Sequence, residues 1–157
     1  MEKRTRVKAR VMAHALRDIL LEGDNVIIMG HKNPDVDSIG SSIGVAKIAS
    51  SNGIKANIIL NDEDIDDTLS RLMKEVEAKE DLYNIFINSE DAWDMMSPKT
   101  TVVIVDTHRP SMVLDEDILN KATRKVVIDH HRRADDMISS PLLVYICLLY
   151  TSLSGLA

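Results

Sequence analysis

Histidine and aspartate residues cluster at three places in the sequence, each directly after a short apolar run. The first place is the segment GHKNPDVDSIG, the second is VDTH and the third is IDHH. In chain order these residues are His31, Asp35 and Asp37, then Asp106 and His108, then Asp129, His130 and His131. Imidazole and carboxylate groups without thiolates are typical ligands of Mn²⁺, Fe²⁺, Mg²⁺ or Zn²⁺. The three clusters therefore predict a metal site with oxygen and nitrogen ligands.

The apolar runs before these clusters are predicted to be buried β-strands. Strands are predicted at residues 25–30, 55–60, 100–106 and 125–131. Their apolar character is continuous rather than alternating, which is typical of parallel strands covered on both faces. Helices are predicted over 4–22, from an N-cap at Ser38 to about residue 51, within 62–82, near 89–96 and over 115–123. The sequence thus predicts an α/β fold, an open and mainly parallel β-sheet with helices on both faces.

This fold would bring the three clusters together. Ligands of open α/β sheets bind beyond the carboxyl ends of the strands, where three of the predicted strands end in His and Asp. A site with two metal ions needs one bridging carboxylate, and Asp106 at the end of a central strand suits that role. His31 and Asp35 would hold one ion, and Asp37 and His130 the other. A water between two such ions is acidic enough to attack a phosphoester.

Each of these residues also has an ordinary structural explanation when it is taken alone. Asp35 suits a turn, since it follows Asn33 and a proline. Ser38 is more often a helix cap than a nucleophile. For His108 a structural role is favoured over a catalytic one, and His14 is given no role. Only the coincidence of three clusters at one sheet edge favours the metal site.

The bulk composition indicates one globular domain. The chain has 157 residues, of which 45% are hydrophobic and 28% charged, with a net charge of −6 and one cysteine. These values exclude a disulfide framework and a cysteine-based zinc site, and they do not favour a general nucleic-acid binder. We expect a cytoplasmic location, because no apolar run approaches the roughly 18 residues of a membrane span.

Longer segments around the three clusters carry a family resemblance. GHKNPDVDSIGSSIG, VVIVDTH and VVIDHHRR resemble, in order, the first three motifs of the DHH phosphoesterase superfamily. Together with KARVMAHAL and IDHHRRADDMISSPLLVY they are most similar to the cyclic-di-AMP phosphodiesterases of the GdpP type. The resemblance implies a DHH domain over residues 1–146, with its first helix at about 4–22. Residues 147–157, CLLYTSLSGLA, depart from the family pattern and are predicted to be an aberrant tail.

The resemblance also implies an activity, hydrolysis of cyclic di-AMP to pApA through a water activated by two Mn²⁺ ions, with Fe²⁺ or Co²⁺ as alternatives. It implies the same metal ligands: His31, Asp35, Asp37, Asp106 and His130. The implied catalytic residues are His131, which faces the substrate phosphate, and Asp129, which supports the histidines. His131, Arg132 and Arg133 are the implied substrate-binding residues, with Lys32 and Arg109 as further candidates.

Two family features are absent from the 157 residues, a fourth metal-binding aspartate and the DHHA1 domain that grips the substrate. We therefore expect weak or no activity from this chain. The full-length relatives implied by the resemblance are membrane-anchored, with this domain in the cytoplasm. The expected partner is a cyclic dinucleotide or a short phosphoester, and a homodimer is left open. Alternative functions are a manganese-dependent inorganic pyrophosphatase, a nanoRNase or pApA phosphatase, and a non-catalytic metal- or nucleotide-binding module.

Overall fold

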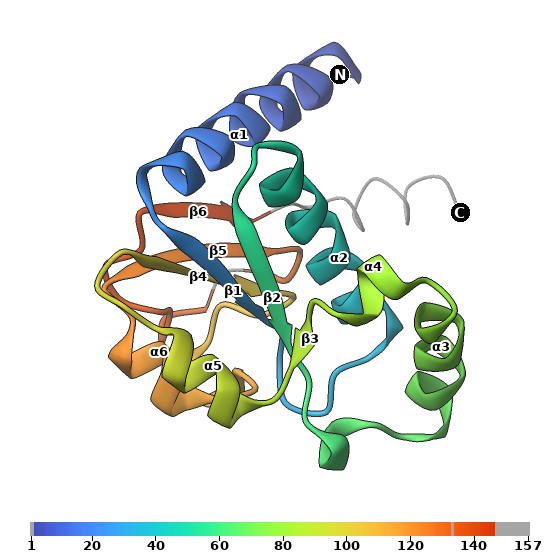
Figure 1. Ribbon diagram of the computed structural model, residues 1–157. Helices are drawn as coiled ribbons and strands as arrows, with labels where there is room; N and C mark the ends of the chain where they lie inside the picture. The colour runs from blue at the N-terminus through green and yellow to red at the C-terminus, as the bar shows by residue number, and fades with distance from the viewer. Residues whose placement is uncertain (1, 133, 147–157) are drawn as a thin grey trace.

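The computed structural model describes residues 2–132 and 134–146, and these form a six-stranded parallel sheet covered by helices (Figure 1). The strand order is β3-β2-β1-β4-β5-β6, and every neighbouring pair is parallel. The strands are β1 Asn25–Met29, β2 Lys55–Ile59, β3 Phe86–Ile87, β4 Thr100–Val105, β5 Arg124–Asp129 and β6 Leu143–Ile146. The predicted α/β fold with a parallel sheet is confirmed.

Most connections between consecutive strands contain a helix, and the first helix precedes β1. The helices are α1 Glu2–Glu22, α2 Val36–Ser51, α3 Asp67–Glu77, α4 Glu80–Tyr83, α5 Ser89–Met95 and α6 Glu116–Lys121. Two 3₁₀ turns, η1 Asp62–Asp64 and η2 Pro110–Met112, lie in the loops after β2 and β4. Among the described residues, none of these helices combines the length and the apolar character needed to cross a bilayer.

Both faces of the sheet are buried because the strand residues alternate between two cores. In β1, Val26 and Ile28 pack with residues of α1 and α2, whereas Ile27 and Met29 pack with residues of α5 and α6. Successive side chains of a strand point to opposite faces, so a strand covered on both sides needs apolar residues throughout. This double burial explains the continuous apolar runs of the sequence.

The connections reverse direction between β1 and β4. From β1 the chain goes outward to β2 and β3, and it then returns to place β4 on the other side of β1. A reversal of this kind opens a crevice at the carboxyl ends of the two central strands, and ligands of open α/β sheets bind there. His31 follows β1 and Asp106 follows β4, so the two residues flank the crevice.

The start of α2 differs from the prediction. The N-cap is Asp35, whose Oδ1 accepts a hydrogen bond from the backbone N–H of Ser38 at 2.8 Å, so the prediction of Ser38 as the cap was wrong. Ser38 instead lies buried in the first turn, against Gly30. A Cβ atom on Gly30 would lie 1.9 Å from Ser38 Oγ, so only glycine allows this approach of β1 and α2.

Both edge strands, β3 and β6, were missed by the sequence analysis. β3 has only two residues and β6 four, and such short runs carry little periodic signal. The predicted aberrant tail over 147–157 lies outside the described residues, as does Arg133.

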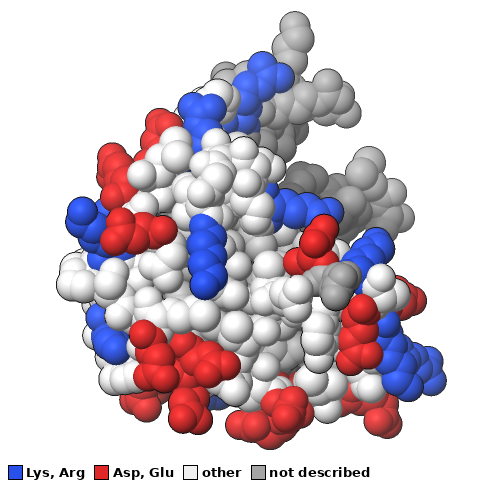
Figure 2. Space-filling model, viewed as in Figure 1, with Lys and Arg blue, Asp and Glu red and all other residues white. Residues whose placement is uncertain are grey.

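Several acidic side chains gather on one part of the face drawn in Figure 2. Figure 2 shows Asp and Glu gathering over the lower part of the molecule, where η1 and α5 lie in Figure 1, whereas Lys and Arg are scattered. The acids of η1 and α5 are Asp62, Glu63, Asp64, Glu90, Asp91 and Asp94. Because η1 follows β2 and α5 follows β3, this charge lies at the same sheet edge as the His and Asp clusters. Such an edge attracts cations.

Candidate metal centre

Asp106 lies between histidines from two other loops. Its Oδ2 is 3.1 Å from Nε2 of His31, which follows β1, and its Oδ1 is 3.0 Å from Nδ1 of His130, which follows β5. The side chain of Asp106 is only 5% exposed. The structure thus brings the three predicted clusters together at the carboxyl edge of the sheet, with one carboxylate facing two imidazoles.

The backbone of Asp106 is what turns its side chain toward the histidines. Its φ is +63°, in the left-handed region, which Asp and Asn tolerate better than most residues. Its N–H still donates to the carbonyl of Ile128 at 3.0 Å, so the chain leaves β4 only after this last bond to β5. Strained conformations of this kind are concentrated at functional sites.

His31 is oriented by its own loop. Its Nδ1–H donates to the carbonyl of Lys32 at 2.6 Å, which leaves Nε2 to face Asp106. Metal-binding histidines are usually held by a hydrogen bond of this type on the other ring nitrogen. Asp35 Oδ2 lies 3.9 Å from the same Nε2, while Asp35 Oδ1 caps α2. His31, Asp35 and Asp106 thus offer donor atoms that all lie within 4.8 Å of one another.

The loop of His31 is fastened to the segment after η2. His31 forms an isolated antiparallel bridge with Val113, Lys32 N–H donates to the carbonyl of Met112 at 2.7 Å, and Leu114 N–H donates to the carbonyl of Gly30 at 2.9 Å. These are backbone contacts, so no side-chain pattern in the sequence revealed them.

Asp129 is saturated with hydrogen bonds. Its Oδ1 accepts from the N–H groups of His130 at 2.8 Å and His131 at 3.2 Å and from His131 Nδ1 at 2.7 Å, and its Oδ2 accepts from His108 Nδ1 at 2.6 Å. Burial alone would raise the pKa of Asp129, but the hydrogen bonds from His108 and His131 outweigh it and hold the pKa below its usual value. Asp129 belongs to a second group of donors within 4.8 Å, with Asp106, His130 and His131. Because both of its oxygens are occupied, it is better suited to support the histidines than to bind an ion.

Asp106 has the opposite electrostatic character. Burial raises its pKa and the charge of Asp35 adds to this rise, while His130 and His31 oppose it only in part. A buried carboxylate that is costly to ionise is a natural partner for a cation, which would compensate its charge.

His130 and His131 stack on one another with ring centroids 4.3 Å apart. They line a pocket of about 440 Å³. Its other polar lining residues are His31, Asp35, Asp37, Asp106, Thr107, His108, Arg109, Asp129 and Arg132. Of the described residues predicted for metal or substrate binding, all except Lys32 line this pocket.

The predicted residues are not equally close to its centre. Asp37 lines the pocket but is in neither group of clustered donors. Arg109 is paired through Nε with both carboxylate oxygens of Asp136, each at 3.1 Å. Lys32 is exposed and does not line the pocket, and Arg133 lies outside the described residues.

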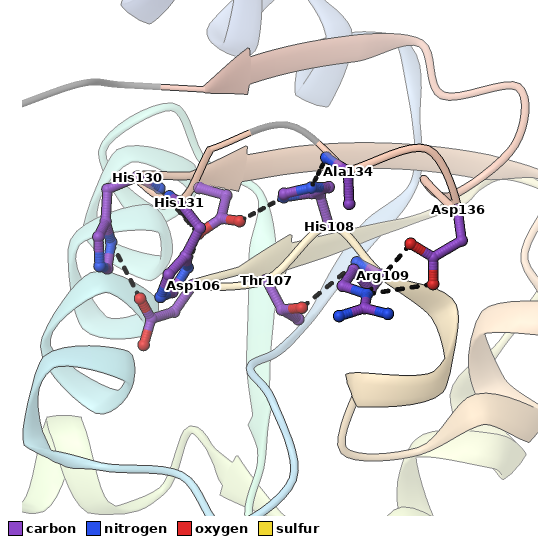
Figure 3. A network of polar contacts seen from close by, with 9 residues as sticks. Asp106, Thr107, His108, Arg109, His130, His131, Ala134 and Asp136 are labelled. Atoms are coloured by element: carbon purple, nitrogen blue, oxygen red, sulfur yellow. Dashed lines mark hydrogen bonds and ion pairs between the residues drawn. The ribbon is translucent and has the colours of Figure 1, made fainter.

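His108 is buried and has partners on both ring nitrogens, which agrees with the structural role favoured from the sequence. Its Nδ1 contacts Asp129, and its Nε2 accepts the N–H of Ala134 at 2.7 Å. Figure 3 shows this network beside Asp106, His130 and His131. The contact with Ala134 was not predicted, because it uses a backbone N–H.

Known proteins share both sequence and fold with this chain. The cyclic-di-AMP phosphodiesterase GdpP of Bacillus subtilis (strain 168) is 50% identical over 145 residues, which are 92% of this chain and 22% of that protein. A probable manganese-dependent inorganic pyrophosphatase of Bacillus licheniformis is 32% identical over 117 residues, 74% of this chain and 34% of that protein. An exopolyphosphatase-related protein from Bacteroides fragilis superposes with a TM-score of 0.57 at 19% identity, covering 86% of this chain and 39% of the other, and this likeness supports the fold.

A match to a whole protein family covers most of the chain. Residues 25–157 match the DHH family, N-terminal domain, and this range includes all three His and Asp clusters. The chain therefore belongs to the DHH family.

Proposed function

We propose that this chain carries the metal-dependent hydrolytic centre of a cyclic-di-AMP phosphodiesterase. Two findings support the proposal: the family match and the identity of 50% to GdpP, although the chain spans only 22% of that protein. The observation that carries it is the position of Asp106, with one carboxylate oxygen 3.1 Å from His31 and the other 3.0 Å from His130. A carboxylate shared in this way suits the bridging ligand of two ions.

The residues present fit divalent ions of the manganese type. His31, Asp35 and Asp106 would hold a first ion, and His130 with Asp37 would hold a second that shares Asp106. The donors are nitrogen and oxygen atoms, as Mn²⁺, Fe²⁺ and Co²⁺ accept, and His31 already has its Nδ1 engaged by a carbonyl. Bound ions of this kind supply Lewis acidity and lower the pKa of a water to near neutrality.

The remaining pocket residues suit an anionic substrate. His131 donates Nδ1–H to Asp129, so its other ring nitrogen is left for a phosphate oxygen. Arg132 lines the same pocket and is exposed, and a guanidinium binds phosphate oxygens with charge-assisted hydrogen bonds. We assign both residues, together with Arg133, to binding of the substrate phosphate.

Manganese binding by calorimetry tests the metal centre. We expect a tighter ion at the His31 side, where all three proposed ligands already lie together, and a weaker ion at the His130 side, because the proposed ligand Asp37 lies outside both donor groups. Asp106→Asn removes the shared negative ligand and is expected to weaken binding of both ions by about 100-fold or more. The matched control is Asp94→Asn, which makes the same change on the exposed surface of α5. Unchanged Mn²⁺ binding by Asp106→Asn would contradict the assignment.

Pyrophosphate hydrolysis is the second candidate function, because one relative is named a probable manganese-dependent inorganic pyrophosphatase. Its identity of 32% is lower than that of GdpP, which favours the phosphodiesterase. The two can be separated by supplying Mn²⁺ with cyclic di-AMP or pyrophosphate and following products by chromatography. Turnover of pyrophosphate that exceeds formation of pApA would reverse this order.

A further inference from the structure

His131, Arg132 and Ala134 line the pocket, and the backbone at Ala134 and Ile138 is hydrogen-bonded to His108, two residues beyond the turn at Asp106. Ala134 N–H donates to His108 Nε2 at 2.7 Å, and Ile138 N–H donates to the carbonyl of His108 at 2.8 Å. Further along, Arg109 pairs with Asp136. Figure 3 shows two of these contacts, His108 with Ala134 and Arg109 with Asp136, beside the pair of His130 and Asp106. His108 takes part in two of the three attachments.

The contacts of His108 determine which ring nitrogen carries the proton. A backbone N–H donates to Nε2, so Nε2 must be without a proton. The proton of the neutral ring is therefore on Nδ1, where it is donated to Asp129 at 2.6 Å. The ring is 2% exposed, so water cannot replace either partner. His108 thus connects the carboxylate of Asp129 to the backbone at Ala134.

Each end of this connection leads to a substrate-binding candidate. On one side Asp129 Oδ1 holds Nδ1 of His131 at 2.7 Å. On the other side Ala134 belongs to the loop of Arg132, and both residues line the pocket. We propose that His108 is a positioning residue, which ties Asp129 and the loop at Ala134 together so that Arg132 is held toward the substrate phosphate. This inference rests on the proposed function, since the phosphate is the ligand that Arg132 would meet.

The wild-type chain allows a first test without metal or nucleotide. In ¹⁵N NMR spectra His108 is expected to carry its proton on Nδ1, with a coupling across the hydrogen bond between the Ala134 amide and Nε2. The Ala134 amide is expected to exchange slowly with solvent. A proton on Nε2, or fast exchange at Ala134, would overturn the inference.

Two substitutions separate the two contacts of the ring. In His108→Asn the amide occupies the place of Nδ1, so it can donate to Asp129 but cannot reach Ala134. In His108→Gln the longer side chain can accept from Ala134, so it restores the loop contact. We expect faster exchange at Ala134 in His108→Asn and near wild-type exchange in His108→Gln. His14→Asn and His14→Gln, on the exposed surface of α1, are the matched controls.

Binding of pApA by the Mn²⁺-loaded chain tests the link to Arg132. Arg132→Ala is expected to weaken binding about tenfold or more, the loss of a hydrogen bond between charged groups. In the His108→Asn background the same substitution is expected to have little further effect, because Arg132 is no longer held in place. In the His108→Gln background its full effect is expected to return.

A purely structural role for His108 gives a different pattern. Arg132→Ala would then weaken pApA binding by the same factor in all three backgrounds, and this result would overturn the inference, as would an absence of any effect in wild type. If the wild-type chain bound neither Mn²⁺ nor pApA, the proposed function would fail. The exchange rates of Ala134 in the two His108 variants would still decide whether His108 holds the loop.

Discussion

Two buried aspartates at the ends of neighbouring strands have opposite pKa shifts, although both contact histidines. Asp129 receives three N–H groups on one oxygen and one on the other, and its pKa is lowered despite burial. Asp106 is also buried, but no hydrogen bond to its carboxylate compensates this burial to the same extent, and its pKa is raised. The carboxylate of Asp129 is therefore stabilised as an anion by the protein alone. The carboxylate of Asp106 would be stabilised as an anion by additional positive charge. This difference in pKa supports the roles proposed for them, Asp129 as a supporting residue and Asp106 as a metal ligand.

Asp106→Asn is predicted to stabilise the metal-free chain. The raised pKa of Asp106 means that its ionised form costs free energy in the folded state at pH 8, and asparagine removes that charge while tolerating the positive φ. We expect the Tm at pH 8 without metal to rise by about 2–4 °C, which corresponds to roughly 1 kcal/mol in a domain of this size. Asp94→Asn should leave the Tm unchanged. A lower Tm for Asp106→Asn would show that the ionised carboxylate is already compensated without metal.

Asp129→Asn is predicted to destabilise the chain. If the amide oxygen takes the place of Oδ1, the amide NH₂ group faces the Nδ1–H of His108, and two donors then meet in a buried site. We expect a loss of about 2–4 kcal/mol of unfolding free energy in urea. Asp136→Asn is the control, because its carboxylate is 51% exposed and a surface ion pair contributes little.

The lowered pKa of Asp129 also predicts how the stability of the metal-free chain depends on pH. Because the pKa of Asp129 is lower in the folded state than in the unfolded state, its contribution is fully present above about pH 5. It is lost as the pH falls toward the native pKa, since the unfolded chain takes up the proton first. Wild type should therefore lose more stability than Asp129→Asn between about pH 5 and pH 3. Parallel curves for the two proteins would contradict the lowered pKa.

At the scale of elements, the site depends on how closely α2 approaches the end of β1. Gly30 and Ser38 form this contact, and Ser38 Oγ is buried without a hydrogen-bond partner among the described residues. Asp35 and Asp37 stand on the first turn of α2 or next to it, so the contact sets their distance from His31.

Gly30→Ala is predicted to separate these elements. The new methyl group would lie 1.9 Å from Ser38 Oγ, and we expect a loss of about 1–3 kcal/mol together with weaker Mn²⁺ binding. Adding Ser38→Ala removes the clashing hydroxyl and should restore most of the loss. Gly40→Ala is the control, since nothing lies within 4 Å of its Cβ position in the helix, and it should stabilise by about 0.5–1 kcal/mol. If Gly30→Ala and the double variant lost the same unfolding free energy, the new methyl group would not be clashing with the hydroxyl of Ser38.

Helices and central strands were predictable because their patterns are local. The N-terminal helix and the strands around Val26, Val103 and Val127 follow from apolar spacing and from burial on both faces. The cap of α2 was misassigned to Ser38, because Asp35 is equally suited to be a cap, a turn residue or a ligand. The edge strands were missed because their pairing depends on the neighbouring strands more than on their own few residues.

At the scale of the whole molecule, parallel strand order turns three distant clusters into one site. Because the carboxyl ends of parallel strands share an edge, the sequence was sufficient to predict that His31, Asp106 and His130 would meet. The contacts that orient them were not predictable, since the carbonyl of Lys32 and the N–H of Ala134 are backbone groups that every sequence contains. The sequence therefore predicted which residues form the site, whereas their hydrogen-bond partners could be identified only from the structure.

Manganese is predicted to stabilise the entire domain, because the ligands proposed for it come from the loops after β1, β4 and β5. At a Mn²⁺ concentration 100 times the Kd, one site adds about 2.7 kcal/mol, so the Tm should rise by roughly 5–10 °C. Differential scanning calorimetry with and without EDTA measures this shift. Asp106→Asn should show little of it, and an equal rise in that variant would mean that the ions bind elsewhere.

The strand order also determines when the site can form during folding. β4 pairs with β1 although β2 and β3 lie between them in the chain, and β5 pairs with β4. Contacts between residues so far apart in the chain form slowly compared with helices and hairpins. The ability to bind Mn²⁺ should consequently be among the last properties to return when the unfolded chain is diluted from urea. In a stopped-flow experiment, the rate at which Mn²⁺ binding returns would then report the rate at which the central sheet is completed.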